Sequence, residues 1–195
     1  MQWPFVQSVL WGALLAGCAG QSSIKPAEVL DERTGVTVGA LQTPIELIEE
    51  TRNAAAGPNA RTSFGYLGPV EWDKSGDISY GLWIHVAPGN DRQIGDIHSQ
   101  GGVTLMLDDG PVALTPIDAP AVGSGPYRPV ASWGQTSYFA LDVALLKRMS
   151  ASATLALEFR GNGNGNDQSP VQFTPTHGTR DTLLKFMQAR GITGD

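Results

Sequence analysis

Two aspartates and a histidine in one loop are the residues best placed to do chemistry. Asp91, Asp96 and His98 lie among glycines and a proline, and an Asp-x-His pair on a loop can ligate a metal ion or act as an acid and base. A dedicated zinc site needs three or four ligands at a recognisable spacing, and His85, His98 and His177 share none. We therefore expect these residues to be ordinary polar residues of a surface loop. A metal-assisted hydrolase that uses His85, Asp96 and His98 is the weakest alternative.

Two tryptophans and a histidine form a second candidate site, for a small ligand or a glycan. Trp83 and His85 lie on the same face of a predicted strand, and Trp133 precedes another strand. Indole rings offer flat apolar faces on which a sugar ring can stack. The competing interpretation places His85 on the solvent face of a half-buried strand. Trp72 falls on the apolar positions of its own strand and is expected in the core.

The remaining patterns predict turns and loops rather than sites. The tract 161–167, Gly-Asn-Gly-Asn-Gly-Asn-Asp, loosely resembles a calcium loop, but it has one carboxylate and lacks the spaced ligands and closing glutamate of an EF-hand. Asp108 and Asp109 are adjacent, so in a strand they would point to opposite faces, and we expect them to form a turn. No serine lies in a Gly-x-Ser-x-Gly motif, and no phosphate-binding glycine loop occurs. We predict no catalytic residue, no metal and no cofactor.

Alternation of apolar and polar residues predicts the elements that would position these side chains. Residues 64–72 and 78–86 alternate on either side of the turn 73–77 and predict one long hairpin. Shorter alternating runs predict further strands near residues 36–38, 45–47, 103–107, 112–114, 138–141, 155–159 and 171–173. Pro116 is expected to end the strand before it, and residues 117–132 read as a long loop.

Two short helices complete the prediction. One is expected over residues 143–149 after the cap Asp142, and the other over residues 180–190 after the cap Thr179, ending at Gly191. About nine strands without regular β-α-β alternation favour a mainly β, antiparallel fold, either a sandwich or barrel-like, and we predict the β-sandwich.

An uncharged apolar run occupies residues 5–17. Its length of about 13 residues is short of the roughly 20 that a membrane-spanning helix needs, so we interpret it as the core of a signal peptide. The run ends at Leu15-Ala16-Gly17-Cys18, and Cys18 is the only cysteine. This stretch resembles the lipobox of bacterial lipoproteins, which has the form Leu-(Ala/Ser)-(Gly/Ala)-Cys. The alternative is an ordinary free thiol in an N-terminal helix.

The resemblance implies that the thiol of Cys18 is joined to diacylglycerol, that the chain is cut before it, and that the new amine is acylated. Ala19, in place of the aspartate that retains such proteins in the inner membrane, implies sorting to the outer membrane. Signal peptides carry Lys or Arg before the apolar core, and residues 1–4 have none, so we expect the true start to lie upstream.

The expected organisation is a signal peptide at 1–17, a lipidated cysteine and flexible tether at 18–31, and one domain at 32–195. Residues 31–38, Asp-Glu-Arg-Thr-Gly-Val-Thr-Val, are similar to the start of the mature domain in some uncharacterised proteobacterial lipoproteins. The net charge is −6, and no cluster of Lys and Arg occurs, so nucleic acid is not an expected partner.

The function we expect is that of a non-enzymatic interaction or assembly module of the bacterial envelope. Its partners would be the membrane, through Cys18, and another envelope protein that docks on an exposed strand edge. A lipoprotein that binds a small ligand or glycan through Trp83, His85 and Trp133 is the alternative.

Overall fold

A long hairpin forms the centre of the fold. The computed structural model describes residues 27–49, 63–89, 94–119, 126–161 and 170–192. Strands β4 (Phe64–Lys74) and β5 (Asp77–Ala87) are antiparallel and pair along their whole length. At the turn, Ser75 and Gly76 have φ of 58° and 92°, and the Gly76 N–H donates to Asp73 Oδ1 over 2.7 Å. The predicted hairpin is confirmed.

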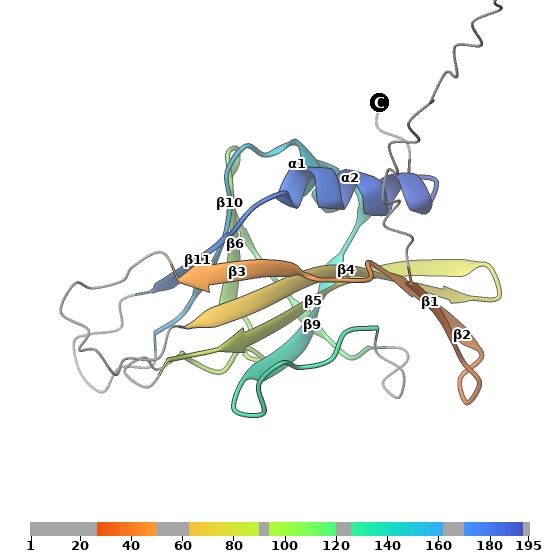
Figure 1. Ribbon diagram of the computed structural model, residues 1–195, viewed down its shortest axis with the longest axis horizontal. Helices are drawn as coiled ribbons and strands as arrows, with labels where there is room; N and C mark the ends of the chain where they lie inside the picture. The colour runs from red at the N-terminus through yellow and green to blue at the C-terminus, as the bar shows by residue number, and fades with distance from the viewer. Residues whose placement is uncertain (1–26, 50–62, 90–93, 120–125, 162–169, 193–195) are drawn as a thin grey trace, which may run out of the picture.

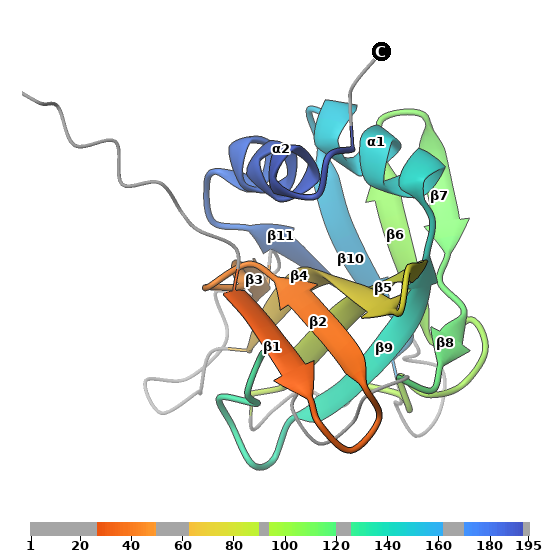
Figure 2. The ribbon, with the colours of Figure 1, turned by 90° about the vertical axis from the view of Figure 1, so that its right-hand side faces the viewer.

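Nine further strands of the described residues join this hairpin in one antiparallel sheet of eleven strands (Figures 1 and 2). The other strands are β1 (Ala27–Asp31), β2 (Val36–Ala40), β3 (Ile45–Glu49), β6 (Val103–Leu107), β7 (Gly110–Ala113), β8 (Pro116–Ile117), β9 (Gln135–Leu141), β10 (Leu155–Phe159) and β11 (Val171–Pro175). Their order is β7-β6-β10-β11-β3-β4-β5-β9-β8, while β2 pairs with β4 and β1 pairs with β2. The predicted mainly β, antiparallel fold is confirmed, but the described strands form one curled sheet rather than the two sheets of a sandwich.

The two ends of this strand order are joined by one short segment. Strands β7 and β8 are two residues apart in the chain, yet β7 pairs with β6 and β8 pairs with β9. Between them, the Leu114 N–H donates to the Val103 carbonyl and the Thr115 carbonyl accepts from the Ala140 N–H. Strand β7 ends before Pro116, as expected, but Pro116 itself begins β8, and Ile117 lies in the stretch predicted as a loop. The sheet therefore curls until its opposite edges share this segment.

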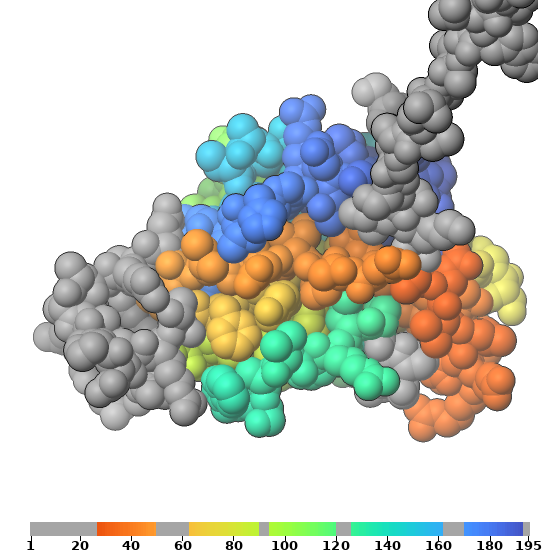
Figure 3. Space-filling view, viewed as in Figure 1, coloured from red at the N-terminus to blue at the C-terminus, as the bar shows by residue number. Residues whose placement is uncertain are grey.

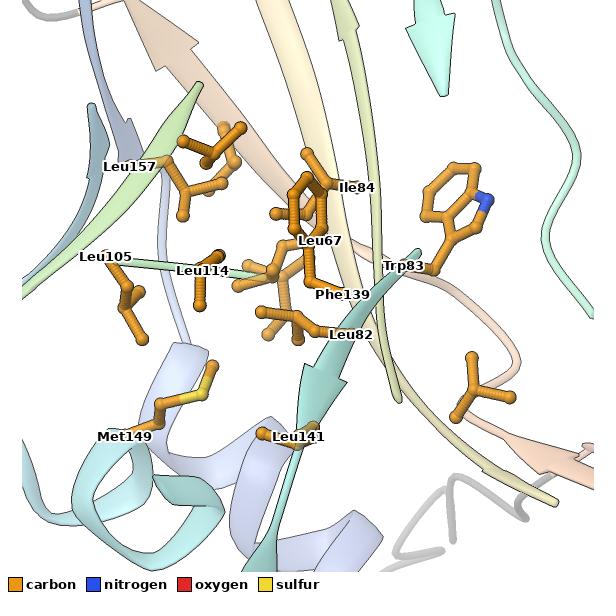
Figure 4. Close-up of a cluster of buried hydrophobic side chains, with 14 of the residues drawn as sticks. Leu67, Leu82, Trp83, Ile84, Leu105, Leu114, Phe139, Leu141, Met149 and Leu157 are labelled. Carbon is orange, nitrogen blue, oxygen red and sulfur yellow. The ribbon is translucent and has the colours of Figure 1, made fainter. Parts of the chain in front are cut away.

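The apolar core lies inside the curled sheet. The cluster in Figure 4 includes Leu67, Leu82, Ile84, Leu105, Leu114, Phe139, Leu141, Met149 and Leu157, all of which are buried. Each fully buried side chain of this size stabilises the fold by about 1.5–3 kcal/mol. Trp83, which lies between Leu82 and Ile84 on β5, points away from the cluster (Figure 4). The hairpin thus presents a second, outer face.

Helix α1 (Val143–Ala151) follows β9 directly. It begins as predicted, because Asp142 Oδ1 accepts the Leu145 N–H over 2.6 Å and so caps the first turn. Leu146 and Met149 on one side of the helix are buried. The helix therefore closes one end of the curled sheet (Figure 1).

Helix α2 (Thr179–Ala189) packs against α1 at the same end (Figure 1). The predicted cap was wrong: Gly178, with φ of 66°, precedes the helix and Thr179 is its first residue. The predicted end is confirmed, because Gly191 is left-handed and the Ile192 N–H donates to the Met187 carbonyl over 2.9 Å. Neither described helix is long and apolar enough to cross a membrane.

The first described strand corrects the expected tether. Ala27–Asp31, placed in the tether by sequence, forms β1 and pairs residue by residue with β2. Glu28, Val29 and Leu30 are all exposed, so burial does not alternate along this strand, and no alternating pattern of apolar residues predicted it. The folded domain therefore includes residue 27.

Candidate functional site

The outer face of the hairpin carries a layer of aromatic side chains. His85 on β5 lies between Tyr66 on β4 and Thr136 on β9, to which it pairs in register. The His85 ring stacks at centroid distances of 6.4 Å on Tyr66 and 6.0 Å on Trp83. Trp83 also meets Tyr127, at 5.0 Å between ring centroids. Trp83 and Tyr127 belong to the hydrophobic cluster of the domain, on the face of β5 opposite Leu82 and Ile84.

A covering loop, residues 126–134, shields this layer from water. Tyr127 anchors its first part, because the Tyr127 hydroxyl accepts the Leu41 N–H over 3.0 Å and donates to the Pro69 carbonyl over 3.1 Å. Gly68 leaves the room for this ring: a Cβ at position 68 would lie 2.4 Å from Tyr127 Cε2. Burial raises the pKa of Tyr127 far above its usual range, so the hydroxyl stays protonated and able to donate.

His85 anchors the end of the same loop. The Ala131 N–H donates to His85 Nε2 over 3.4 Å, so Nε2 carries the lone pair and Nδ1 carries the proton, which is donated to Thr136 Oγ1 over 2.8 Å. Gly134 lies so close that a Cβ there would be 2.4 Å from His85 Cε1. Burial lowers the pKa of His85, while a backbone hydrogen bond with Gln135 raises it to a lesser extent. His85 is a neutral imidazole that fastens the loop.

The covering loop determines which of the residues proposed for ligand binding are exposed to solvent. His85 is 0% exposed, so the expectation that it faces solvent was wrong. Trp83 is 1% exposed, and a sugar ring does not reach its faces in this structure. Trp133 is 56% exposed, at the end of the loop. Trp83 and Trp133 therefore form no common stacking platform. Trp72 is buried in the hydrophobic cluster as expected, on the same face of the hairpin as Trp83.

The Asp-x-His pair forms a turn. Asp96 Oδ1 accepts the His98 N–H over 2.9 Å, and the Asp96 carbonyl accepts from the Ser99 hydroxyl over 2.7 Å. The Asp96 carboxylate thus accepts a hydrogen bond from the backbone of its own turn, and both Asp96 and His98 are exposed. Across the described part of the chain, no three His, Cys, Asp or Glu side chains lie close enough together to hold a metal ion. Asp91 lies outside the described residues.

Asp108 and Asp109 form the expected turn and tie it to α1. Asp108 accepts from the Ala153 and Thr154 backbone N–H groups, over 2.5 and 2.9 Å, and from the Thr154 hydroxyl. These bonds, that of the Thr154 hydroxyl above all, lower the pKa of Asp108. Asp109 forms a two-pronged ion pair with Arg148, with N–O distances of 2.7 and 2.9 Å, which lowers the pKa of Asp109. The two carboxylates bind separate partners, so they do not act as a pair.

A hollow of about 680 Å³ lies beside this turn. It is lined by Met106, Leu107, the segment 152–156, Gln172 and the segment 174–181 without Thr176. Ala156 pairs with Met106 and is small, which leaves space between the loop before β10 and the start of α2. The hollow combines four separate stretches of chain, so no local sequence pattern indicated it.

Strand β1 has one partner. Among the described residues it pairs only with β2, so its other backbone edge is open to pairing (Figure 2). Its exposed side chains are Glu28, Val29 and Leu30.

The predicted lipid site Cys18 and residues 162–167 of the glycine-asparagine tract lie outside the described residues. Comparison with known proteins found no matching family model, no matching curated protein and no matching solved structure.

Proposed function

We propose that this protein is a lipid-anchored, non-enzymatic interaction module of the bacterial envelope. Acyl chains on Cys18 hold it at the outer membrane, and the folded domain docks another envelope protein. The lipobox-like stretch Leu15-Ala16-Gly17-Cys18 supports the anchor. Two or more acyl chains give stable anchoring, since each buried CH₂ contributes about 0.8 kcal/mol.

The open edge of β1 is the observation that carries the docking role. An extended segment of a partner gains main-chain hydrogen bonds when it adds to such an edge, and side chains on alternate positions give specificity. Val29 and Leu30 flank this edge and are 37% and 59% exposed. Edge strands without such a role are commonly protected by Lys or Pro. Within β1 neither residue occurs.

The anchor is tested with Cys18→Ser. We expect the wild-type protein to incorporate labelled palmitate and to partition into detergent, and the variant to do neither and to keep residues 1–17. Ser8→Ala, which changes a serine inside the apolar run, is the control and should behave as wild type. Palmitate incorporation by Cys18→Ser would refute the anchor.

The docking edge is tested by placing a photo-crosslinking amino acid at Leu30 in intact cells. The control position is Ile48, which is 43% exposed but pairs on both sides, with Thr174 on β11 and Phe64 on β4. We expect a defined adduct from position 30 that is absent from position 48, and expect Val29→Lys to abolish it. Equal labelling from both positions would contradict docking at β1.

A second candidate function, binding of a small hydroxylated ligand such as a glycan, is favoured by the hollow. Gln172 and Thr174 on β11 supply an amide and a hydroxyl group along its lining. Titration of sugar fragments, followed by the amide chemical shifts of these residues, tests it. Shifts confined to the hollow and lost in Gln172→Ala would support the candidate, and unchanged shifts would exclude the sugars used.

A further inference from the structure

The covering loop belongs to the longest stretch after residue 27 that carries no acidic residue. From Ala119 to Leu141 the chain has neither Asp nor Glu, and its one charged side chain is Arg128. The whole protein has 19 acidic residues and a net charge of −6. This 23-residue stretch has a formal charge of +1, so its own side chains do not repel an anionic surface.

Two large apolar side chains of the loop face water. Val130 and Trp133 are 60% and 56% exposed, and Arg128 between the anchor Tyr127 and Val130 is exposed as well. Figure 3 shows the green-teal atoms of this part of the chain at the molecular surface, below the orange and yellow strands. Among the described residues, the other large apolar side chains that are exposed belong to Val29, Leu30, Ile48, Ile78 and Leu184.

Those other residues lie beside carboxylates. Val29 and Leu30 have acidic neighbours at positions 28 and 31, Ile48 has one at 49, Ile78 has one at 77, and Leu184 follows Asp181 by one helical turn. Only the apolar pair of the covering loop combines exposure with a positive neighbour and no nearby acid in the sequence. Trp and Arg are the side chains suited to the boundary between lipid chains and headgroups.

The loop is held in shape from beneath. The hydroxyl of Tyr127 bridges two backbone groups, the Ala131 N–H binds His85, and the Gly134 N–H donates to the Ala131 carbonyl over 3.1 Å. A surface that is ordered before binding loses less conformational entropy when it binds. Val130 and Trp133 are thus presented on a fixed support.

We propose that the covering loop, residues 126–134, lies on the surface of an anionic phospholipid bilayer. Trp133 and Val130 enter the interfacial region, and the Arg128 guanidinium binds lipid phosphate. The proposal rests on the proposed lipid anchor for the approach to the membrane: residues 18–26 span at most about 30 Å when fully extended, so an anchored domain stays near the bilayer. The loop contact would then give the domain a defined orientation.

The test uses the tryptophan that the structure exposes. The mature acylated protein is reconstituted into vesicles of phosphatidylcholine and phosphatidylglycerol (3:1), with either brominated or plain acyl chains. Bromine quenches only nearby indoles, and Trp72 and Trp83 are buried. We expect brominated chains to remove up to one third of the emission, since Trp133 is one of three tryptophans after Cys18. In Trp133→Phe this loss should vanish.

Arg128→Glu should reduce the quenching at least twofold, because a carboxylate is repelled by anionic headgroups and costly to bring to the lipid interface. Arg33→Glu makes the same charge change at an exposed site outside the loop and should leave quenching unchanged. Equal emission in brominated and plain vesicles, or equal effects of the two substitutions, would overturn the proposal. A second pair of results would also overturn it: a photo-crosslinking amino acid placed at position 133 labels a protein, and Trp133 of the wild type is not quenched by brominated lipid.

The two proposals fail separately. Acyl chains found by mass spectrometry together with unquenched Trp133 would leave the anchor in place and remove the loop contact. If no acyl chain is found, the anchor fails, and the full chain is then mixed with the same vesicles. Quenching there that is reduced in Trp133→Phe supports the loop contact, and quenching that Trp133→Phe leaves unchanged, or that is absent, overturns it.

Discussion

The guanidinium of Arg190 lies directly on the backbone of Gly39. A Cβ at position 39 would be 2.3 Å from Arg190 Cζ, and the Arg190 side chain is 6% exposed. Its Nη1 atom lies 2.7 Å from Glu28 Oε1 and 3.5 Å from Glu71 Oε1. One cation at the end of α2 therefore joins β1, β2 and β4, and it does so only because residue 39 has no side chain.

Gly39→Ala is expected to destabilise the domain by about 1–3 kcal/mol, the usual cost of added volume at a packed site. The guanidinium must move away and weaken its contact with Glu71, whose carboxylate is largely buried. Urea unfolding measures the change in the free energy of unfolding.

Arg190→Ala supplies the control for this substitution. In that background Gly39→Ala should cost little, because the group it clashes with is gone, and the coupling free energy between the two changes should be substantial. Equal costs of Gly39→Ala in both backgrounds would show that the Arg190 contact is not the source of the effect.

Local sequence patterns predicted the elements whose signals are local. The hairpin of β4 and β5, the Asp142 cap and the Gly191 helix end were all readable, because alternation, capping and left-handed glycine act within a few residues. The contact between Gly39 and Arg190 joins positions 151 residues apart, and no local pattern encodes it. The same holds for the segment between β7 and β8 that joins both edges of the sheet.

The candidate site shows the same limit more sharply. Alternation correctly put Trp83 and His85 on the face of β5 opposite Leu82 and Ile84. It indicates that a strand has two faces, but not what covers each. The covering loop buries His85, and the sequence reads that stretch as an ordinary loop rich in Gly and Pro. A glycine opposite an aromatic ring, such as Gly68 under Tyr127, becomes informative only once the pairing is known.

The buried imidazole predicts a loss of stability in acid. The pKa of His85 is lowered in the folded state, chiefly by burial, so the unfolded chain binds a proton more readily. As the pH falls below the unfolded pKa of about 6.5, proton binding by the unfolded chain lowers the free energy of unfolding, by at most about 1.4 kcal/mol per pH unit. This loss stops growing once the pH is below the lowered pKa of the folded state. Urea unfolding of the wild type between pH 7.5 and pH 5 measures it.

His85→Gln removes the titrating group and provides the comparison. This variant should be less stable than wild type at pH 7.5, because it loses ring contacts with Tyr66 and Trp83, yet its stability should fall less between pH 7.5 and 5. Parallel pH profiles of the two proteins would show that His85 does not contribute to the acid sensitivity.

Tyr127→Phe is expected to cost about 1–3 kcal/mol, since two buried backbone groups lose their partner. The Leu41 N–H donates to this hydroxyl, and the Pro69 carbonyl accepts from it. Hydrogen exchange gives the specific readout: the Leu41 amide should exchange faster in the variant, relative to amides of the inner cluster. An unchanged Leu41 exchange rate would mean that another group replaces the hydroxyl.

The turn of the central hairpin has a serine at a position where another residue type is expected to be more stable. Ser75 has φ of 58° and is followed by Gly76 at 92°, the pattern of a two-residue turn that favours Asn-Gly. Asparagine tolerates the left-handed conformation better than serine, so Ser75→Asn should stabilise the domain by about 0.5–1 kcal/mol and raise Tm by about 2 °C. Ser75→Val places a β-branched residue at positive φ and should lower Tm instead. A thermal melt that ranks valine at or above serine would contradict the left-handed conformation of residue 75.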